Sequence, residues 1–238
     1  MRISIVGTGR AGTSFALALE KAGHAVSLWH HDELGSIGDC QLLLLAVPDD
    51  AIAEVAAMVA PRHDRLVVHV AGSRTLAVLA PHPRVASLHP LTTLPSGEIG
   101  ARRLVGATYC VAGDRAVIDV VNSLEGRIIS LSDAQRTAYH ATASVAANHL
   151  VALMGHVAAL ASSAGLCLED FLPLAHQALR DVGEFGPQAA LTGPASRGDM
   201  ATIDAHLAAI PESERSTYVA MANAAFELAE QRRSQTSA

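Results

Sequence analysis

The sequence predicts an α/β fold in which a doubly wound, mostly parallel sheet is followed by an all-helical second domain. Short apolar strands alternate with helices up to residue 131, a glycine-rich turn follows the first strand, and only helical patterns follow residue 131. Such alternation is typical of parallel sheets covered by helices. We therefore expect two domains, residues 1–131 and residues 132–238.

The N-terminal stretch has the order strand, glycine turn, helix, strand. Residues 3–6 form a β-branched run typical of a buried parallel strand, and residues 25–29 form a second strand. A helical pattern lies between them at residues 13–22 and ends at Gly23. This context makes the glycine pattern a specific signal of a Rossmann dinucleotide-binding unit.

Three glycines in this turn have the spacing that a dinucleotide needs. Gly7 allows the tight turn, Gly9 lets a pyrophosphate approach the backbone, and Gly12 lets helix and strand pack closely. The helix N-terminus offers N–H groups and a positive dipole end to the phosphates. The expected cofactor-binding residues of the turn are Gly7, Gly9, Arg10, Ala11 and Gly12.

The residues after the second strand bear on the choice between NADP and NAD. His30 and His31 suit a ribose 2′-phosphate better than a bare diol, and Arg10 adds positive charge. Asp32 favours NAD, because an acid near this position can bind the ribose hydroxyls. We favour NADP and keep NAD as the alternative; the two histidines could also be a solvated loop pair.

The carboxyl ends of the later strands supply further candidates. Strands are expected at residues 40–48, 66–70, 85–88, 109–112 and 127–131, helices at about 51–59 and 115–124, and a loop at 94–106. Ligands of doubly wound sheets lie along the carboxyl ends of the strands. The expected contacts to the nicotinamide side are Ala46, Val47 and Pro48, and the substrate-binding candidates are Ser73, His89 and Pro90.

The second domain is expected to contain helices at residues 134–163, 168–182, 200–209 and 212–230, with a loop at 183–198 and a frayed polar tail after Gln231. Ser132 or Asp133 is the expected N-cap of the long first helix. The sequence shows no internal repeat and no low-complexity linker.

A polar stripe on the long helix indicates catalytic chemistry. His140, Ser144 and Asn148 are spaced by four, so a regular helix brings them to one face. Reduction of a carbonyl needs a proton donor, which His140 can be, while the other two can orient the substrate. Alternatively, backbone groups or a partner chain satisfy the stripe. Arg197 is the candidate for binding a substrate carboxylate, or else a solvated loop charge.

Composition excludes several classes of function. The net charge is −6 without a basic block, which argues against nucleic acid, and no apolar run is long and unbroken enough to predict a membrane span. The start of the sequence lacks a signal-peptide pattern. Three isolated cysteines fit a reducing cytoplasm, and the twelve histidines form no metal-ligand spacing, so we expect no metal.

Several motifs together resemble one known family along nearly the whole chain. They are the glycine turn with Arg10, the segment 46–49, the segment 89–91, the helix around Asn148 and the segment 191–199. They are similar to predicted oxidoreductases that join a Rossmann-like domain to a helical domain of unassigned function. These belong to the set related to 6-phosphogluconate dehydrogenase, ketopantoate reductase, prephenate dehydrogenase and pyrroline-carboxylate reductase.

Within that set the sequence looks most like ketopantoate reductase, whose helical domain carries a lysine and two asparagines spaced by four. Asn148 alone matches that pattern, and the only lysine of the sequence is Lys21 in the first Rossmann helix. A lysine mechanism therefore does not carry over. His89-Pro90 is similar to a prephenate dehydrogenase motif but lacks the phenylalanine and glycine that should follow.

The resemblance and the residues together predict an NADP-dependent oxidoreductase that reduces a small 2-oxo acid, with ketopantoate as the leading substrate. One alternative is a dehydrogenase of the same fold that acts on an imine or a sugar acid. Another is a non-catalytic dinucleotide-binding redox sensor, which the missing lysine favours. The alanine-rich helices of the second domain would suit a homodimer interface.

Overall fold

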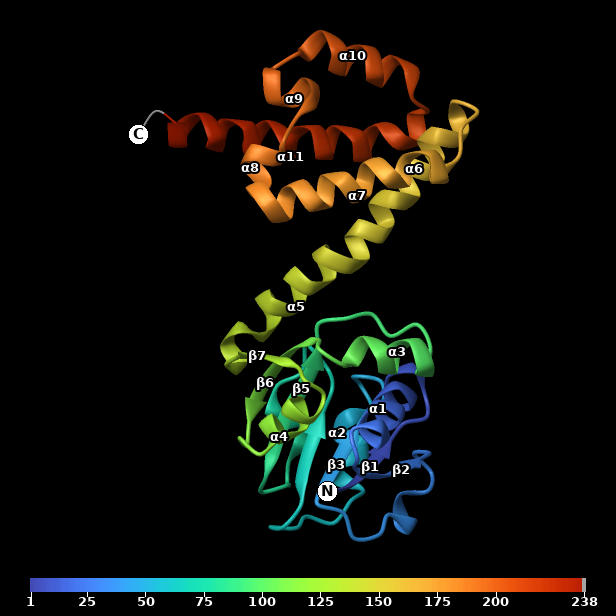
Figure 1. The fold of residues 1–238 in the computed structure, drawn as a ribbon, viewed down its shortest axis with the longest axis vertical. Coiled ribbons are helices and arrows are strands. Elements are labelled where there is room, and N and C mark those ends of the chain that lie inside the picture. Colours follow the sequence, from blue (N-terminus) through green and yellow to red (C-terminus); the bar gives the residue numbers. More distant parts are fainter. Residues whose placement is uncertain (237–238) are drawn as a thin grey trace. The chain divides into compact units, whose positions relative to one another are not determined.

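The computed structural model describes residues 1–236 and contains two compact units, Met1–Ala147 and the chain from Asn148 onward. The first unit contains a seven-stranded sheet, and the described residues of the second are built from helices (Figure 1). The predicted fold class is confirmed. The last strand ends at Ser130, and the two units divide further along, within the long helix that follows.

The sheet is parallel from β1 to β5 and reverses once. Its strands are β1 (Arg2–Val6), β2 (Ala25–Trp29), β3 (Leu42–Leu45), β4 (Leu66–His69), β5 (Val85–Pro90), β6 (Thr108–Gly113) and β7 (Arg127–Ser130), in the order β2-β1-β3-β4-β5-β6-β7. β6 runs antiparallel to β5, and β7 runs parallel to β6. From β1 the chain passes to β2 on one side and then to β3 on the other. The carboxyl ends of β1 and β3 therefore flank a switch point, where such sheets bind ligands.

Helices cover both faces of the sheet. They are α1 (Arg10–Lys21), α2 (Ile52–Ala57), α3 (Gly97–Leu104) and α4 (Val117–Ser123), with short 3₁₀ helices at Leu34–Ser36, Leu76–Leu79 and Asp133–Gln135. Successive side chains of β3 alternate between two apolar clusters: Leu42 and Leu44 join α1, α3 and α4, whereas Leu43 and Leu45 join α2. All four leucines are buried, as expected for a parallel strand with both faces covered.

Helix α3 corrects the expectation of a loop at residues 94–106. The Ser96 hydroxyl accepts a hydrogen bond from the N–H of Ile99 and caps the helix. Helix α3 packs against α1, where a Cβ on Gly100 would overlap Ser14. The sequence prediction was wrong because this short helix gains its stability from packing against α1, which local composition does not reveal.

The long helix after the sheet consists of α5 (Arg136–Ser144), a π-helical turn (Val145–His149) and α6 (Leu150–Ser163). At its start the Gln135 side chain accepts hydrogen bonds from the N–H and hydroxyl of Ser132, which is the N-cap of the 3₁₀ helix Asp133–Gln135 that leads into α5. In a π turn, hydrogen bonds join residues five apart. The regular spacing predicted for His140, Ser144 and Asn148 therefore does not continue through Asn148.

The second unit departs from prediction at two places. Its remaining helices are α7 (Leu168–Phe185), α8 (Pro187–Ala190), α9 (Gly193–Arg197), α10 (Met200–Ala209) and α11 (Glu212–Thr236). The predicted loop at 183–198 thus holds the end of α7 and two short helices with proline in their first turn. Residues 231–236 continue α11 where a frayed tail was predicted, and residues 237–238 lie outside the described part.

Within residues 1–236, the helix Asp133–Ser163 has the length and apolar composition to cross a bilayer. This assignment rests only on the length and the composition of the helix. Asn148, His149 and His156 interrupt its apolar character, which is why the sequence predicts no membrane partner.

Candidate functional site

The glycine turn lies at the carboxyl end of β1 and begins α1. Gly7 has a φ of +116°, and a Cβ there would overlap the Ala46 carbonyl of the neighbouring strand connection. A Cβ on Gly12 would overlap the Gly7 carbonyl. The protein's own packing therefore requires these two glycines. Gly9 differs, because a Cβ there would meet no atom within 4 Å. Its missing side chain leaves open space in front of the turn, as a bound phosphate would require.

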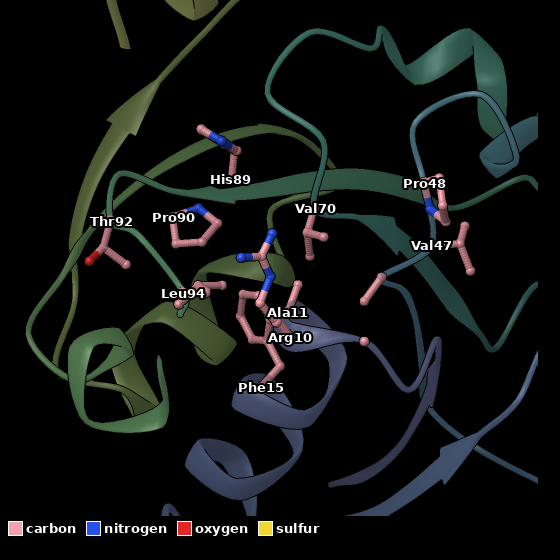
Figure 2. A pocket seen from close by; sticks show the side chains of 12 residues that line it. Arg10, Ala11, Phe15, Val47, Pro48, Val70, His89, Pro90, Thr92 and Leu94 are labelled. Atoms are coloured by element: carbon pink, nitrogen blue, oxygen red, sulfur yellow. The ribbon is translucent and has the colours of Figure 1, made fainter. Parts of the chain in front are cut away.

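Two cavities adjoin this turn and share a wall made by Gly9, Ala46, Val47 and Pro48. We call them the His30 cavity and the His89 cavity. The His30 cavity has a volume of about 610 Å³. Its other lining residues are Gly7, Thr8, His30, His31, Asp32, Ala51, Glu54, Val55 and Met58. The His89 cavity has a volume of about 450 Å³, and its other lining residues are Arg10, Ala11, Phe15, Val70, His89, Pro90, Thr92 and Leu94 (Figure 2).

The loop after β2 forms the end of the His30 cavity. Nδ1 of His30 lies 2.5 Å from a carboxylate oxygen of Asp32, and the N–H of His30 donates to Glu33 at 2.8 Å. The hydrogen bond from His30 lowers the pKa of Asp32 below its ordinary value. The rings of His30 and His31 are 4.2 Å apart between centroids. Asp32 is thus bound to the histidine that the sequence predicts to hold a 2′-phosphate.

A cluster of polar rings lies at the other end, where β5 meets α5. The Tyr139 hydroxyl is 2.6 Å from Nδ1 of His89, and the rings of His89 and His140 are 6.1 Å apart between centroids. A Cβ on Gly72 would lie 2.7 Å from Nδ1 of His140 and 2.9 Å from Nε2 of His89. Both imidazoles therefore reach the same glycine in the connection after β4.

Burial sets the protonation of this cluster. Burial, followed by the nearby His140, lowers the pKa of His89 to about 4. His89 is therefore neutral at pH 7. Burial also raises the pKa of Tyr139, with a further contribution from the Cys110 thiol, so its hydroxyl stays protonated. His89 and Tyr139 form a neutral pair, in which one hydrogen bond joins two side chains that carry no charge.

A buried arginine fixes α5 to the sheet. The Arg136 guanidinium donates to the Ser87 hydroxyl of β5 and, at 2.8 Å, to the Asp133 carboxylate. Its side chain is only 2% exposed, so the two partners compensate a buried charge. Arg136 precedes Tyr139 and His140 by about one helical turn. It therefore determines where these two side chains meet His89.

The structure brings together most of the residues predicted to bind the cofactor. Nine of the ten predicted positions line one or both cavities: Gly7, Gly9, Arg10, Ala11, His30, His31, Ala46, Val47 and Pro48. Gly12 is buried beneath the turn instead. Among the substrate candidates, His89 and Pro90 line the His89 cavity, whereas the Ser73 hydroxyl donates to Asp49 at 2.7 Å.

The remaining predicted residues divide between the two units. His140 and Ser144 belong to the first unit, whereas Asn148 and Arg197 belong to the second. The Arg197 side chain is 65% exposed and lies 3.9 Å from the Asp199 carboxylate. The catalytic roles of His140, Ser144 and Asn148 and the substrate role of Arg197 stay predictions.

Sequence reasoning missed Tyr139, Arg136 and Thr92. Tyr139 directly precedes His140, but its partner lies fifty positions earlier in the chain. Only the packing of α5 on β5 joins them. Arg136 carried no sequence signal of burial, because arginine is mostly exposed in proteins.

Among the described residues, no three or more His, Cys, Asp or Glu side chains are grouped to hold a metal ion.

Comparison with known proteins gives one family match and several structural matches. The family model described as a domain of unknown function (DUF2520) matches residues 108–225, from β6 into α11, and does not include the glycine turn. No curated protein matches the chain.

Solved structures match over nearly the full length. A Bacteroides fragilis protein provisionally assigned as an NADP oxidoreductase has a TM-score of 0.79 at 22% identity, covering 95% of this chain and 98% of that one. Pyrroline carboxylate reductase from Plasmodium falciparum, with NADP bound, has a TM-score of 0.62 at 14% identity, covering 98% of both chains. An imine reductase from Streptomyces aurantiacus has a TM-score of 0.65 at 17% identity, covering 97% and 99%. At these identities the likeness establishes a shared fold.

Proposed function

We propose that this protein is an NADP-dependent oxidoreductase that reduces the carbonyl group of a small 2-oxo acid. The observation that carries the proposal is the pair of adjoining cavities at the carboxyl ends of β1 and β3. An extended dinucleotide needs such a site on both sides of the glycine turn. The NADP oxidoreductase and the pyrroline carboxylate reductase with NADP bound, both among the similar structures, support the same cofactor.

The residues of both cavities fit NADP. The open space in front of Gly9 leaves room for the pyrophosphate, and the N-terminus of α1 provides N–H groups for it. His30 and His31 would hold the 2′-phosphate, while Ala46, Val47 and Pro48 would contact the nicotinamide side. Bound NADPH supplies a hydride to the substrate carbon.

The histidine cluster would supply hydrogen bonds and a proton to the substrate oxygen. When the Tyr139 hydroxyl donates to Nδ1 of His89, the neutral ring carries its proton on Nε2, the atom that faces Gly72. His89 can then stabilise negative charge that develops on the oxygen. His140 reaches the same point and is our candidate for the general acid, with Ser144 of the same unit as an orienting donor.

Reduction of a carbon–nitrogen double bond is the second candidate. Two of the similar structures, an imine reductase and a pyrroline carboxylate reductase, favour it. The predicted likeness to ketopantoate reductase favours the 2-oxo acid. A non-catalytic redox sensor would bind NADPH in the same cavities and turn over neither substrate.

The deciding experiment measures NADPH oxidation after addition of ketopantoate, with NADH and a cyclic imine in parallel. We expect oxidation of NADPH with the 2-oxo acid and loss of turnover in His140→Ala with NADPH affinity retained. Turnover of the imine alone would replace the substrate class. NADPH binding, detected by its fluorescence, without turnover of any substrate would leave the sensor function.

We also propose that the protein forms a homodimer through its helical unit. Helices α6, α7 and α11 expose large apolar side chains, among them Val151, Leu174, Leu179, Phe185 and Met221. Apolar surface of this kind is common where helices of a second subunit pack. Light scattering with size-exclusion chromatography should give twice the chain mass of 24.7 kDa, and a monomer would contradict the proposal.

A cytoplasmic location remains a prediction; the three cysteines are unpaired.

A further inference from the structure

The charges of the two cavities differ. The His30 cavity is lined by Asp32 and Glu54 together with two histidines. The lining of the His89 cavity includes Arg10, His89 and Thr92, and no aspartate or glutamate. A cavity with one full positive charge, hydrogen-bond donors and no acid favours an anionic ligand.

Arg10 is available for such a ligand. Within residues 1–236 it forms no ion pair, whereas Arg74, Arg84 and Arg136 of the same unit each lie beside a carboxylate. Figure 2 shows the guanidinium directed toward Val70 and Pro90 rather than toward the shared wall at Val47 and Pro48. Arg10 lines the His89 cavity alone, so it does not belong to the 2′-phosphate end.

We propose that Arg10 binds the carboxylate of the substrate, in place of the role that the sequence predicts for Arg197. A guanidinium can hold a carboxylate by two parallel hydrogen bonds and fix its orientation. His89 and Thr92 of the same cavity then remain for the adjacent carbonyl oxygen. The inference rests on the proposed function and names its substrate class as a 2-oxo acid bound as the anion. The other anion that could reach Arg10 is the cofactor pyrophosphate.

The test uses oxamate, a non-reducible analogue of a 2-oxo acid, and its neutral ethyl ester. Binding of each to the NADPH-saturated full chain is measured by calorimetry, and NADPH affinity is measured separately by fluorescence. The variants are Arg10→Ala and Arg10→Lys. Arg102→Ala is the matched control, because it removes one positive charge from an exposed position of α3 outside both cavities.

We expect Arg10→Ala to weaken oxamate binding by roughly tenfold or more, as for loss of a charged hydrogen bond. Ester binding should change less than about twofold, Arg10→Lys should recover part of the oxamate affinity, and Arg102→Ala should match the wild type. Circular dichroism verifies that each variant is folded.

Two outcomes would overturn the inference alone. Weaker NADPH binding in Arg10→Ala with unchanged oxamate binding would assign Arg10 to the pyrophosphate. A wild type that binds NADPH but not oxamate would remove the carboxylate site and leave the cofactor assignment intact. A wild type that binds no NADPH would overturn the proposed function itself, together with the inference that rests on it.

Discussion

The hydroxyl of Tyr139 in α5 lies 2.6 Å from Nδ1 of His89 at the end of β5. This contact joins the long helix to the cavity wall and leaves Nε2 as the ring nitrogen of His89 that faces Gly72. His89 is neutral at pH 7 because burial lowers its pKa to about 4. The pair thus provides an uncharged, oriented donor beside His140.

Tyr139→Phe removes the hydroxyl and keeps the ring, so Tyr139 can be tested as a positioning residue for His89. We expect kcat to fall by about 2- to 10-fold, the equivalent of one hydrogen bond, with NADPH affinity unchanged. Tyr218→Phe is the matched control, because its hydroxyl also lies 2.6 Å from a histidine Nδ1, that of His206. Equal effects of the two substitutions on kcat would contradict the assignment.

Gly9 and Gly12 should separate cofactor binding from folding. Gly9→Ala adds a methyl group to open space, so we expect weaker NADPH binding by about tenfold or more with stability changed by less than about 1 kcal/mol. Gly12→Ala must displace the Gly7 carbonyl and should cost several kcal/mol, roughly 3 or more. Urea titrations with and without NADPH measure both quantities. If Gly9→Ala bound NADPH as the wild type does, the phosphate would not lie at Gly9.

His31 should contribute to the preference for NADPH over NADH. An imidazole N–H can donate a hydrogen bond to a phosphate oxygen. We expect the ratio of NADH to NADPH dissociation constants to fall by about tenfold in His31→Ala. His63→Ala, at an exposed position outside the cavity lining, is the control. An unchanged ratio in His31→Ala would assign the 2′-phosphate to other residues.

His69 should make the first unit sensitive to acid. It is fully buried at the end of β4, no hydrogen-bond partner satisfies either ring nitrogen, and burial followed by the charge of Arg136 lowers its pKa to about 4. The folded pKa lies below the unfolded value of 6.5, so this contribution to stability is complete above about pH 6.5. It is lost progressively as the pH falls toward 4, by roughly 3 kcal/mol.

His69→Leu removes the titrating ring and should therefore reduce the pH dependence of stability. The similar contribution of His89 should remain in this variant. Denaturation at pH 4 to 7, followed by the fluorescence of Trp29 in β2, measures the effect, with His63→Gln as an exposed control. A pH dependence equal to that of the wild type would exclude His69 as its source.

The sequence by itself determined the glycine turn, the alternation of strands and helices, and the wall at Ala46, Val47 and Pro48. These features depend on residues close together in the chain: apolar runs of strand length, glycines with fixed spacing, and the rule that ligands lie at carboxyl ends of strands. All nine cavity-lining positions predicted for the cofactor come from three such segments: the glycine turn, the loop after β2 and the end of β3.

Only the tertiary structure decided which distant side chains meet. Helix α3 forms because α1 lies beside it, and Tyr139 meets His89 because buried Arg136 fixes α5 to Ser87. The direction of Arg10, into the His89 cavity rather than the His30 cavity, likewise follows from how the surrounding elements pack. The energy of such contacts arises between elements far apart in the chain, so no local pattern of residues records it.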